Sequence, residues 1–376
     1  MRILLIAPHP FYQERGTPIA VKLLSETLCE FGHEVDILTY HEGTDFSLKG
    51  LRIFRIIKPF FIKNIPIGFS WKKVFADFYL TVLLIRLVIK NKYDVIHAVE
   101  ESIFPAAFVN LFIKKKLIYD MDSSMADQLI ERKESLKNFH KLLDGFEALA
   151  VKRADLVIPV CKYLADKVRS YDKNKKIFIL EDIAFESNGI SKEENIRQTF
   201  NLRGVIALYI GNLEHYQGID LLLESVVKIN SSVPFSIVII GGNQTDILKY
   251  QAIAKDLNIS NKVYFIGPRS FKELPYYLSQ ADILLSPRIK GKNTPMKLYS
   301  YLASGKPVLA TRIDSHLQAI DDSTSKLADA DPDSFALGLQ ELIENENMRN
   351  AIGEAGRILA KNNYSLDSYK FKLKKI

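Results

Sequence analysis

The chain has 376 residues, of which 47% are hydrophobic and 25% are charged, a composition typical of globular proteins and a length that suits two domains. No stretch reaches the roughly 18 uninterrupted apolar residues of a membrane-spanning helix, and the apolar run before Pro8 is too short for a signal peptide. The cysteines, Cys29 and Cys161, lack the spacing of metal ligands, so we expect them to be core residues in a reducing compartment. These features predict a cytoplasmic protein.

The positive charge is concentrated in the first half of the chain. Residues 1–180 hold 28 Lys and Arg against 21 Asp and Glu, whereas residues 181–376 hold 23 of each. Residues 49–92 contain ten cations and a single acid, Asp77. A basic, apolar-rich segment of this kind suits an anionic membrane surface, where each nearby cation contributes about 1 kcal/mol. An ordinary solvated face is the alternative, and nucleic acid is not expected as a partner because no binding motif for it is present.

Strand and helix patterns alternate along the first half. Apolar runs predict strands at Arg2–Ala7, Val35–Tyr40, Leu51–Ile57, Asp94–Ala98, Lys116–Met121 and Asp155–Pro159. The first of these is expected to be a buried strand of a parallel sheet. A long helix is predicted at Trp71–Lys92 after an unusually apolar linker, and aromatic and basic residues meet there that suit either a membrane interface or a core: Phe60, Phe61, Phe69 and Trp71 beside Lys63, Lys72 and Lys73.

Polar side chains follow two of these strands. His97 and Glu101 lie at the end of the strand Asp94–Ala98, and Asp120 and Asp122 lie at the end of the strand Lys116–Met121. Ligands of α/β sheets bind at the carboxyl ends of strands. Glu101 is therefore a candidate cleft-facing carboxylate, whereas His97 is either a site residue or a buried polar group.

A second series of strands and helices begins at Gly204, after a polar connector at Glu186–Asn201. Its strands are predicted near Val205–Ile210, Phe235–Gly241, Lys262–Ile266 and Asp282–Ser286. The glycine-rich dinucleotide fingerprint G-x-G-x-x-G is absent, which argues against a dehydrogenase. The chain is thus predicted to contain two Rossmann-like halves.

The stretch from Ser286 to Thr311 is the most informative one. A strand ends at Ser286-Pro287, a basic loop follows, and a helix ends at Gly305 before the next strand. Asn293 or Thr294 is the expected N-cap, with Pro295 at the first helical position. Helix N-termini bind anions well, and four cations surround this one: Arg288, Lys290, Lys292 and Lys297. The pattern favours a phosphorylated ligand over a merely solvated loop.

The same stretch resembles the donor-binding segment of GT-B glycosyltransferases, family 4 in particular, because Ser304-Gly305-Lys306-Pro307-Val308 falls on that family's x-G-x-P-V core. Further motifs follow in the family's order, among them Gly32-His33-Glu34-Val35, Tyr93-Asp94-Val95-Ile96-His97, Gly211-Asn212-Leu213 and Ala281-Asp282. The resemblance implies an acceptor domain at residues 1–185 and a donor domain at residues 186–359, facing each other across a cleft. A final helix at about residues 360–376 would cross back to the first domain.

The resemblance also implies a donor site, with several departures from the family. Asn212 and Gln217 replace an arginine and a lysine that hold the donor diphosphate, and Lys292 and Ser300 occupy the two acid positions of the E-x7-E motif. Arg288 is the first candidate to restore the lost charge. The implied donor-binding residues are Gly16, Gly211, Asn212, Gln217, Gly242, Arg288, Lys292, Asn293, Thr294, Met296, Lys297 and Ser300.

The residues for the chemistry itself are less clearly marked. The family often carries a histidine near the reacting sugar carbon, but Asp120 and Asp122 occupy that neighbourhood here. A carboxylate can instead take the acceptor's proton as general base, so the candidate catalytic residues are Asp122, Glu101 and His97. Asp120-Met121-Asp122 also matches the metal-binding D-x-D of the GT-A architecture, which the GT-B order of elements argues against. We therefore expect no metal and no cofactor.

The sequence as a whole predicts a glycosyltransferase that moves a sugar from a nucleotide-sugar to a glycan or lipid-linked acceptor. The resemblance to family 4 implies that transfer proceeds with retention of configuration and without a metal. The expected role is in cell-surface polysaccharide or glycolipid synthesis, in the cytoplasm or at the inner face of the membrane. Two alternatives stay open. One is a non-catalytic relative that acts as a binding or scaffold protein, which the four substitutions favour; the other is a sugar-nucleotide epimerase that uses Asp122 and Glu101.

Overall fold

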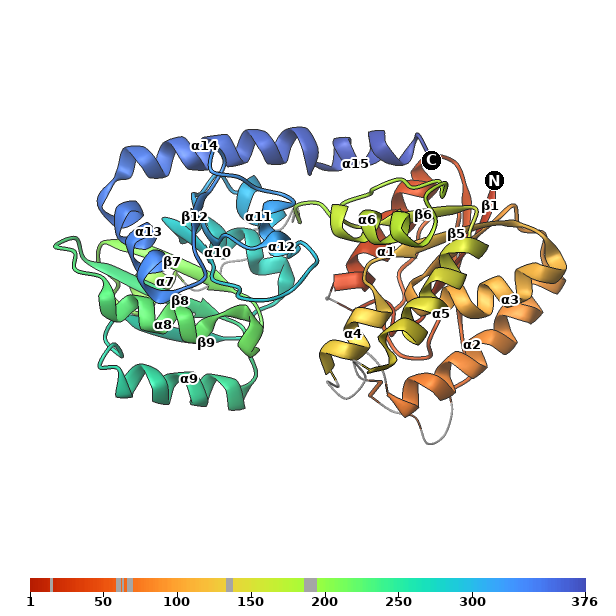
Figure 1. The fold of residues 1–376 in the computed structure, drawn as a ribbon, viewed down its shortest axis with the longest axis horizontal. Coiled ribbons are helices and arrows are strands. Elements are labelled where there is room, and N and C mark those ends of the chain that lie inside the picture. Colours follow the sequence, from red (N-terminus) through yellow and green to blue (C-terminus); the bar gives the residue numbers. More distant parts are fainter. Residues whose placement is uncertain (14–15, 59–61, 63, 66–69, 133–137, 186–194) are drawn as a thin grey trace. The chain divides into compact units, whose positions relative to one another are not determined.

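The computed structural model describes residues 1–13, 16–58, 62, 64–65, 70–132, 138–185 and 195–376. The chain forms two compact units, of which the first comprises residues 1–181 with Ile376 and the second residues 182–375. Each unit contains one six-stranded parallel sheet with helices packed against it (Figure 1). The predicted α/β architecture with two Rossmann-like domains is therefore confirmed.

The sheet of the first unit has the strand order β3-β2-β1-β4-β5-β6. The strands form where the sequence has short apolar runs, and β1, β2 and β4 are almost wholly buried, as expected for parallel strands covered on both faces. Their bounds are Arg2–Ala7 (β1), Glu34–Thr39 (β2), Leu51–Arg55 (β3), Val95–Val99 (β4), Lys116–Met121 (β5) and Leu156–Pro159 (β6).

The helices of the first unit connect these strands. Ser70 caps the longest of them, α2, by accepting a hydrogen bond from the backbone N–H of Lys73 at 3.2 Å. The bounds are Gly16–Glu30 (α1), Trp71–Lys90 (α2), Glu100–Ser102 (η1), Ile103–Ile113 (α3), Met125–Arg132 (α4), His140–Arg153 (α5) and Lys162–Tyr171 (α6).

The second unit repeats this plan, with the strand order β12-β11-β10-β7-β8-β9. Its strands are Val205–Ile210 (β7), Phe235–Ile240 (β8), Val263–Gly267 (β9), Ile283–Ser286 (β10), Val308–Thr311 (β11) and Lys326–Ala328 (β12). Its helices are Ile196–Thr199 (α7), His215–Gln217 (η3), Ile219–Lys228 (α8), Gln244–Asp256 (α9), Phe271–Glu273 (η4), Leu274–Gln280 (α10), Lys297–Ala303 (α11), Asp314–Leu317 (α12), Pro332–Glu344 (α13), Glu346–Asn363 (α14) and Leu366–Leu373 (α15).

The hydrophobic cores are built unit by unit. One cluster of buried residues in the first unit joins β1, β2 and β4 to α2, α3, α5 and α6. Two clusters in the second unit lie on the two faces of its sheet, one under α8, α9 and α13 and the other under α10, α11 and the end of α14. No helix among the residues that the structure describes is long and apolar enough to cross a membrane.

The strand orders mark where each unit binds ligands. In both sheets the first strand is central, and the connections reverse direction next to it, between β1 and β4 and between β7 and β10. The carboxyl ends of the strands at such a switch point leave a crevice for ligands. The loops after β7 and β10 hold the residues 211–218 and 287–296, and the loop after β4 holds Glu100 and Glu101.

The start of α11 differs from the sequence prediction. The predicted N-cap of α11 is wrong, because this helix begins at Lys297 and is preceded by Met296, without a side-chain cap from Asn293 or Thr294. The predicted linker anchors Phe60, Phe61, Lys63 and Phe69 lie outside the described residues. A C-terminal helix is present as α15, and its crossing to the first domain stays a prediction.

Candidate functional site

The loops after β7, β8 and β10 meet backbone to backbone at the carboxyl edge of the second sheet. A Cβ atom at Gly241, which has φ +116°, would lie 2.0 Å from the carbonyl oxygen of Gly211. A Cβ atom at Gly218, with φ +74°, would lie 1.9 Å from the carbonyl oxygen of Pro287. Only glycine fits at these two positions, so the sequence brings the loops into direct contact.

Lys297 is the central cation of this edge. Its Nζ donates to Oε1 of Gln217 at 3.2 Å and lies 4.0 Å from the centroid of the Tyr209 ring. Burial, with a further contribution from the charge of Arg288, holds the pKa of Lys297 well below its usual range. Among the described residues no carboxylate forms an ion pair with Lys297, and a partly buried ammonium without one favours an incoming anion.

Arg288 lies beside Lys297 and is held in place by its own loop. Its guanidinium donates to the carbonyl oxygens of Lys290 at 2.6 Å and Asn293 at 3.2 Å, and lies 5.3 Å from the centroid of the Tyr216 ring. It also fills the space beside Gly291, where a Cβ atom would come within 1.9 Å of Nη2. Arg288 and Lys297, both predicted to bind the donor, lie close enough that the charge of Arg288 acts on the pKa of Lys297.

A buried histidine, His316, contacts the strand residues that flank and hold this loop. The sequence does not indicate this role. His316 lies on the short helix α12, and its Nε2 is 2.9 Å from Oγ of Ser286 while its Nδ1 is 2.7 Å from the carbonyl oxygen of Thr311. The hydroxyl of Thr311 donates to the carbonyl oxygen of Arg288. Burial lowers the pKa of His316 to about 3, so the ring is neutral and adds no charge to the site.

The remaining predicted residues of the second unit lie in different surroundings. Asn212 donates from Nδ2 to the Tyr216 hydroxyl at 3.4 Å, and its carbonyl oxygen accepts the Tyr209 hydroxyl at 2.6 Å. Lys292 is exposed. The hydroxyl of Ser300 is buried and accepts the backbone N–H of Phe185 at 3.0 Å, so it holds the residue just before the predicted connector.

Three other members of the predicted set lie in the loops of the second unit, and one lies in the first unit. Thr294 and Met296 precede α11 and are half-buried. Gly242 has φ +78°, and a Cβ atom there would meet the Leu213 side chain at 2.5 Å. Gly16 is the first residue of α1 in the other unit.

The strand ends of the first unit carry a group of carboxyl side chains. His97 is buried, and its Nε2 lies 2.9 Å from Oδ2 of Asp120 on the neighbouring strand β5. His97 is therefore a buried polar group whose partner is Asp120. Asp122 follows β5 and is half-buried. Among the described residues no group of three or more histidines, cysteines and acids has the arrangement of a metal site.

Glu100 is a candidate site residue that the sequence pattern does not indicate, whereas its neighbour Glu101 is predicted. Glu100 has φ +52°, a strained conformation for this residue, and both its carboxyl oxygens accept the Ser123 hydroxyl, at 2.9 and 2.8 Å. Burial and the charge of Glu101 raise the pKa of Glu100 to about 8. Glu101 itself forms an ion pair with Lys73 of α2. Strained residues with shifted pKa values concentrate at functional sites, and this one lies beside the switch point.

Asp77 of α2 belongs to the same group and provides a test of it. It accepts the buried Tyr40 hydroxyl, and burial together with the charge of Glu101 raises the pKa of Asp77 to about 7. The folded state therefore holds a proton that the unfolded chain, with a carboxyl pKa of about 4, has released. Stability from this group is lost as the pH rises from about 4 to about 7.

We expect the variant Asp77→Asn to gain stability relative to the wild type as the pH rises from 5 to 8, because asparagine keeps an acceptor for Tyr40 without a charge. The gain in melting temperature should be about 3–6 °C, measured through Trp71, the single tryptophan, which lies on the same helix. Asp166→Asn, at an exposed site on α6, should show no such trend. A pH-independent difference at Asp77 would contradict the shifted pKa.

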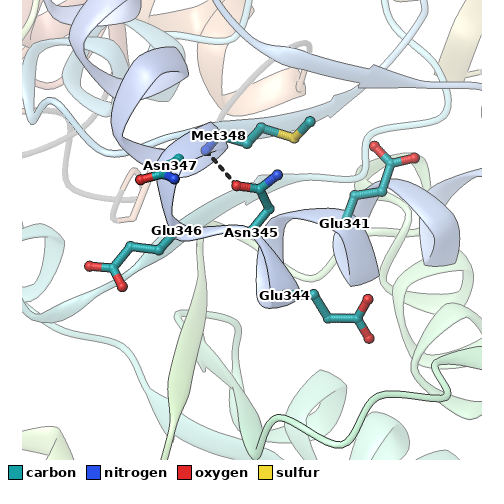
Figure 2. A pocket seen from close by; sticks show the side chains of 6 residues that line it. All are labelled: Glu341, Glu344, Asn345, Glu346, Asn347 and Met348. Carbon is teal, nitrogen blue, oxygen red and sulfur yellow. Dashed lines mark hydrogen bonds between the residues drawn. The ribbon is translucent and has the colours of Figure 1, made fainter.

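A hollow at the turn between α13 and α14 has a different character (Figure 2). It is lined by Glu341, Glu344, Asn345, Glu346, Asn347 and Met348, and Asn345 caps α14 by accepting the N–H of Met348 at 2.9 Å. Three carboxylates repel an anion, so this hollow does not suit a phosphorylated ligand.

Comparisons with known proteins agree with the two-unit plan. The family "Glycosyltransferase Family 4" matches residues 15–181, and the family "Glycosyl transferases group 1" matches residues 191–359. An uncharacterized glycosyltransferase of Methanocaldococcus jannaschii is 26% identical over 371 residues, covering 94% of this chain and 91% of the relative.

Two solved structures share the fold. Sucrose-phosphate synthase from Thermosynechococcus elongatus aligns with a TM-score of 0.79 at 17% identity, covering 100% of this chain and 97% of the other. The Anabaena protein HepE in complex with UDP aligns with a TM-score of 0.73 at 13% identity, covering 100% and 99%.

Proposed function

Because the chain is a glycosyltransferase of the GT-B fold, in which a family 4 domain is followed by a group 1 domain, we propose that it transfers a sugar from a nucleotide-sugar to a glycan or lipid-linked acceptor. The expected role is in the synthesis of cell-surface polysaccharide or glycolipid. The observation that supports this most directly is the pair of cations Arg288 and Lys297 at the switch point of the second sheet.

In this proposal the donor diphosphate binds against Lys297 and Arg288, with Gly211 and Gly242 giving it close access to the backbone. The charges that Asn212 and Gln217 do not supply come from these two cations instead. Gln217 keeps a role, because its side-chain oxygen positions the ammonium of Lys297. The charge that develops on the leaving diphosphate would be stabilised by groups already in place, which is the largest contribution to many enzymatic rate enhancements.

Lys297 is well suited to this task because its charge is costly in the free enzyme. A bound diphosphate would offset that cost and raise the pKa of Lys297 again. Lys292, Asn293, Thr294 and Met296 would line the same loop, while Ser300 would act on the donor ribose only indirectly, since its hydroxyl accepts from Phe185.

On the acceptor side we assign the general base to a carboxylate at the edge of the first sheet. Asp122 is the first candidate, and Glu101 is the second because Lys73 neutralises it. His97 would act by holding Asp120. We propose that transfer proceeds with retention of configuration and without a metal, in the cytoplasm, with the chain peripheral to the inner face of the membrane when the acceptor is lipid-linked.

The donor site can be tested by thermal shift against UDP-, GDP-, ADP- and CMP-sugars. The UDP compounds come first, because the solved structure of HepE contains UDP. A nucleotide at about 100 times its Kd should stabilise the folded chain by about 2.7 kcal/mol. We expect one nucleotide class to raise the melting temperature of the wild type and not that of Arg288→Ala.

Lys290→Ala is the matched control, since Lys290 lies in the same loop but is exposed, and it contributes only its carbonyl oxygen to Arg288. Its shift should equal that of the wild type. If no nucleotide-sugar stabilised the wild type, or if Lys290→Ala and Arg288→Ala lost the shift equally, the proposed donor site would be wrong.

A further inference from the structure

Three neighbouring helices of the first unit expose an unusual amount of apolar surface. Helices α2, α3 and α5 lie in a row over one face of the sheet, with α3 in contact with both of the others (Figure 1). They carry twelve of the 21 large hydrophobic side chains that are exposed among the described residues. These are Trp71, Val74, Phe75, Phe78, Ile85, Ile89, Phe108, Leu111, Phe112, Leu142, Phe146 and Leu149.

Helix α3 exposes apolar side chains because its sequence is apolar on all sides. Its sequence, IFPAAFVNLFI, has one polar residue, Asn110, and so lacks a polar side to turn to solvent. A helix that is apolar all round is normally buried. Here Ile103, Ala106 and Val109 face the core, yet Phe112 is 74% exposed. The outer side of α3 is therefore suited to an apolar environment outside this unit.

The exposed charges within these three helices are all basic. Exposed cations gather towards the carboxyl ends of the helices: Arg86, Lys90, Lys114, Lys115, Lys152 and Arg153. They outnumber the two exposed acids at this rim, Asp94 and Asp155, each of which accepts a backbone N–H at 2.7 Å. Because the three helices each run between parallel strands of one sheet, their carboxyl ends lie along the same rim. The face therefore has an apolar centre and a basic edge.

The acids of the same helices are turned inward and neutralised. Asp77 bonds to the buried Tyr40. Glu147 is buried and accepts the hydroxyls of Ser124 and Tyr171, each at 2.9 Å. Asp144 accepts the Tyr171 hydroxyl at 2.7 Å and lies 3.5 Å from the ammonium of Lys167. No exposed carboxylate interrupts the face along these three helices.

We propose that this three-helix face docks on an anionic lipid bilayer, with its aromatic and aliphatic side chains in the interface and its basic edge against the phosphates. Apolar faces with tryptophan, phenylalanine and leucine beside lysine and arginine bind membranes in this way. A second copy of the chain fits less well, because a symmetric contact places the same patch on both partners and would bring two basic edges together. The inference supplies the contact surface for the membrane placement proposed above, and in that respect rests on it.

The test is co-sedimentation of the purified full chain with vesicles of phosphatidylcholine alone and of phosphatidylcholine mixed with phosphatidylglycerol. We expect binding to the mixed vesicles that weakens as salt is added. Lys114→Glu/Lys115→Glu should weaken it by about fivefold or more for each cation. Phe78→Ser/Phe112→Ser should weaken it by about tenfold or more for each ring, through lost apolar burial.

Matched controls come from the second unit. Leu337→Ser removes an apolar side chain that is 65% exposed, close to the 64% of Phe78, and Lys255→Glu/Lys361→Glu reverses two exposed lysines in the last turns of α9 and α14. Both should bind like the wild type. Nucleotide-induced thermal shift should be unchanged in every variant, which separates docking from the donor site and shows that the variants are folded.

Three results would overturn the proposal. One is failure of the wild type to bind either kind of vesicle. Another is binding that the control variants lose as strongly as the three-helix-face variants. The third is a dimer in analytical ultracentrifugation that Phe78→Ser/Phe112→Ser dissociates, since a second copy would then cover this face.

Discussion

Replacing Lys297 by methionine should lower kcat/KM for the nucleotide-sugar by about a hundredfold to a thousandfold, the loss typical of removing a group that stabilises developing negative charge. Methionine keeps most of the aliphatic volume that packs over Tyr209 and removes the ammonium. The measurement is a steady-state transfer assay with the donor class that thermal shift identifies. Lys290→Met, at the exposed position of the same loop, should stay near the activity of the wild type.

The melting temperature of Lys297→Met distinguishes a functional charge from a structural one. The lowered pKa of Lys297 means that the folded state disfavours its charged form, so an apolar replacement should leave the melting temperature unchanged or higher. A large loss of activity without a loss of stability would therefore identify a charge used for function. Activity within a few-fold of the wild type would contradict the assignment of Lys297 to the diphosphate.

Gly241→Ala should lower the unfolding free energy of the second unit by about 3 kcal/mol or more, because a new Cβ has to displace backbone as well as adopt a strained conformation. The atom would lie 2.0 Å from the carbonyl oxygen of Gly211 at φ +116°. Thermal unfolding followed by circular dichroism measures the loss. The transition of the second unit is the one that nucleotide shifts, whereas Trp71 reports on the first.

Gly267→Ala separates the clash from the backbone strain. Gly267 also has a positive φ, +81°, but its nearest neighbour to a new Cβ is the Ile247 side chain at 3.8 Å, an ordinary contact. Alanine there should cost only about 1 kcal/mol. Equal losses at the two glycines would show that the approach of the loops after β7 and β8 is not tight.

The strands were predictable because parallel strands that are buried on both faces consist of short apolar runs, as in Arg2–Ala7 and Val205–Ile210. The cationic loop was predictable for a related reason, since Arg288 and Lys297 lie in one continuous stretch of strand, loop and helix. Local sequence therefore accounts for the sheets and for the cationic loop.

Contacts between distant segments were not predictable. His316 is held by a hydrogen bond with Ser286, which lies thirty residues earlier in the chain. Nothing in the sequence next to His316 indicates that it supports the loop of Arg288. Ser300 is predicted to act on the donor, and nothing in the sequence around it indicates that its hydroxyl accepts the backbone N–H of Phe185, just before the connector. Glu100 and Glu101 are adjacent acids, and only the backbone conformation of Glu100 and the ion pair of Lys73 distinguish them.

The division of the sheets along the chain has a consequence for synthesis. All six strands of the first unit, β1 to β6, end by Pro159, and its core draws only on residues before the connector. A nascent chain can therefore pair all six strands of the first sheet and close its core while residues beyond 182 are still being translated, as N-terminal domains commonly do. The second sheet, whose central strand β7 is its first to be made, then grows outward on both sides without waiting for any strand of the first.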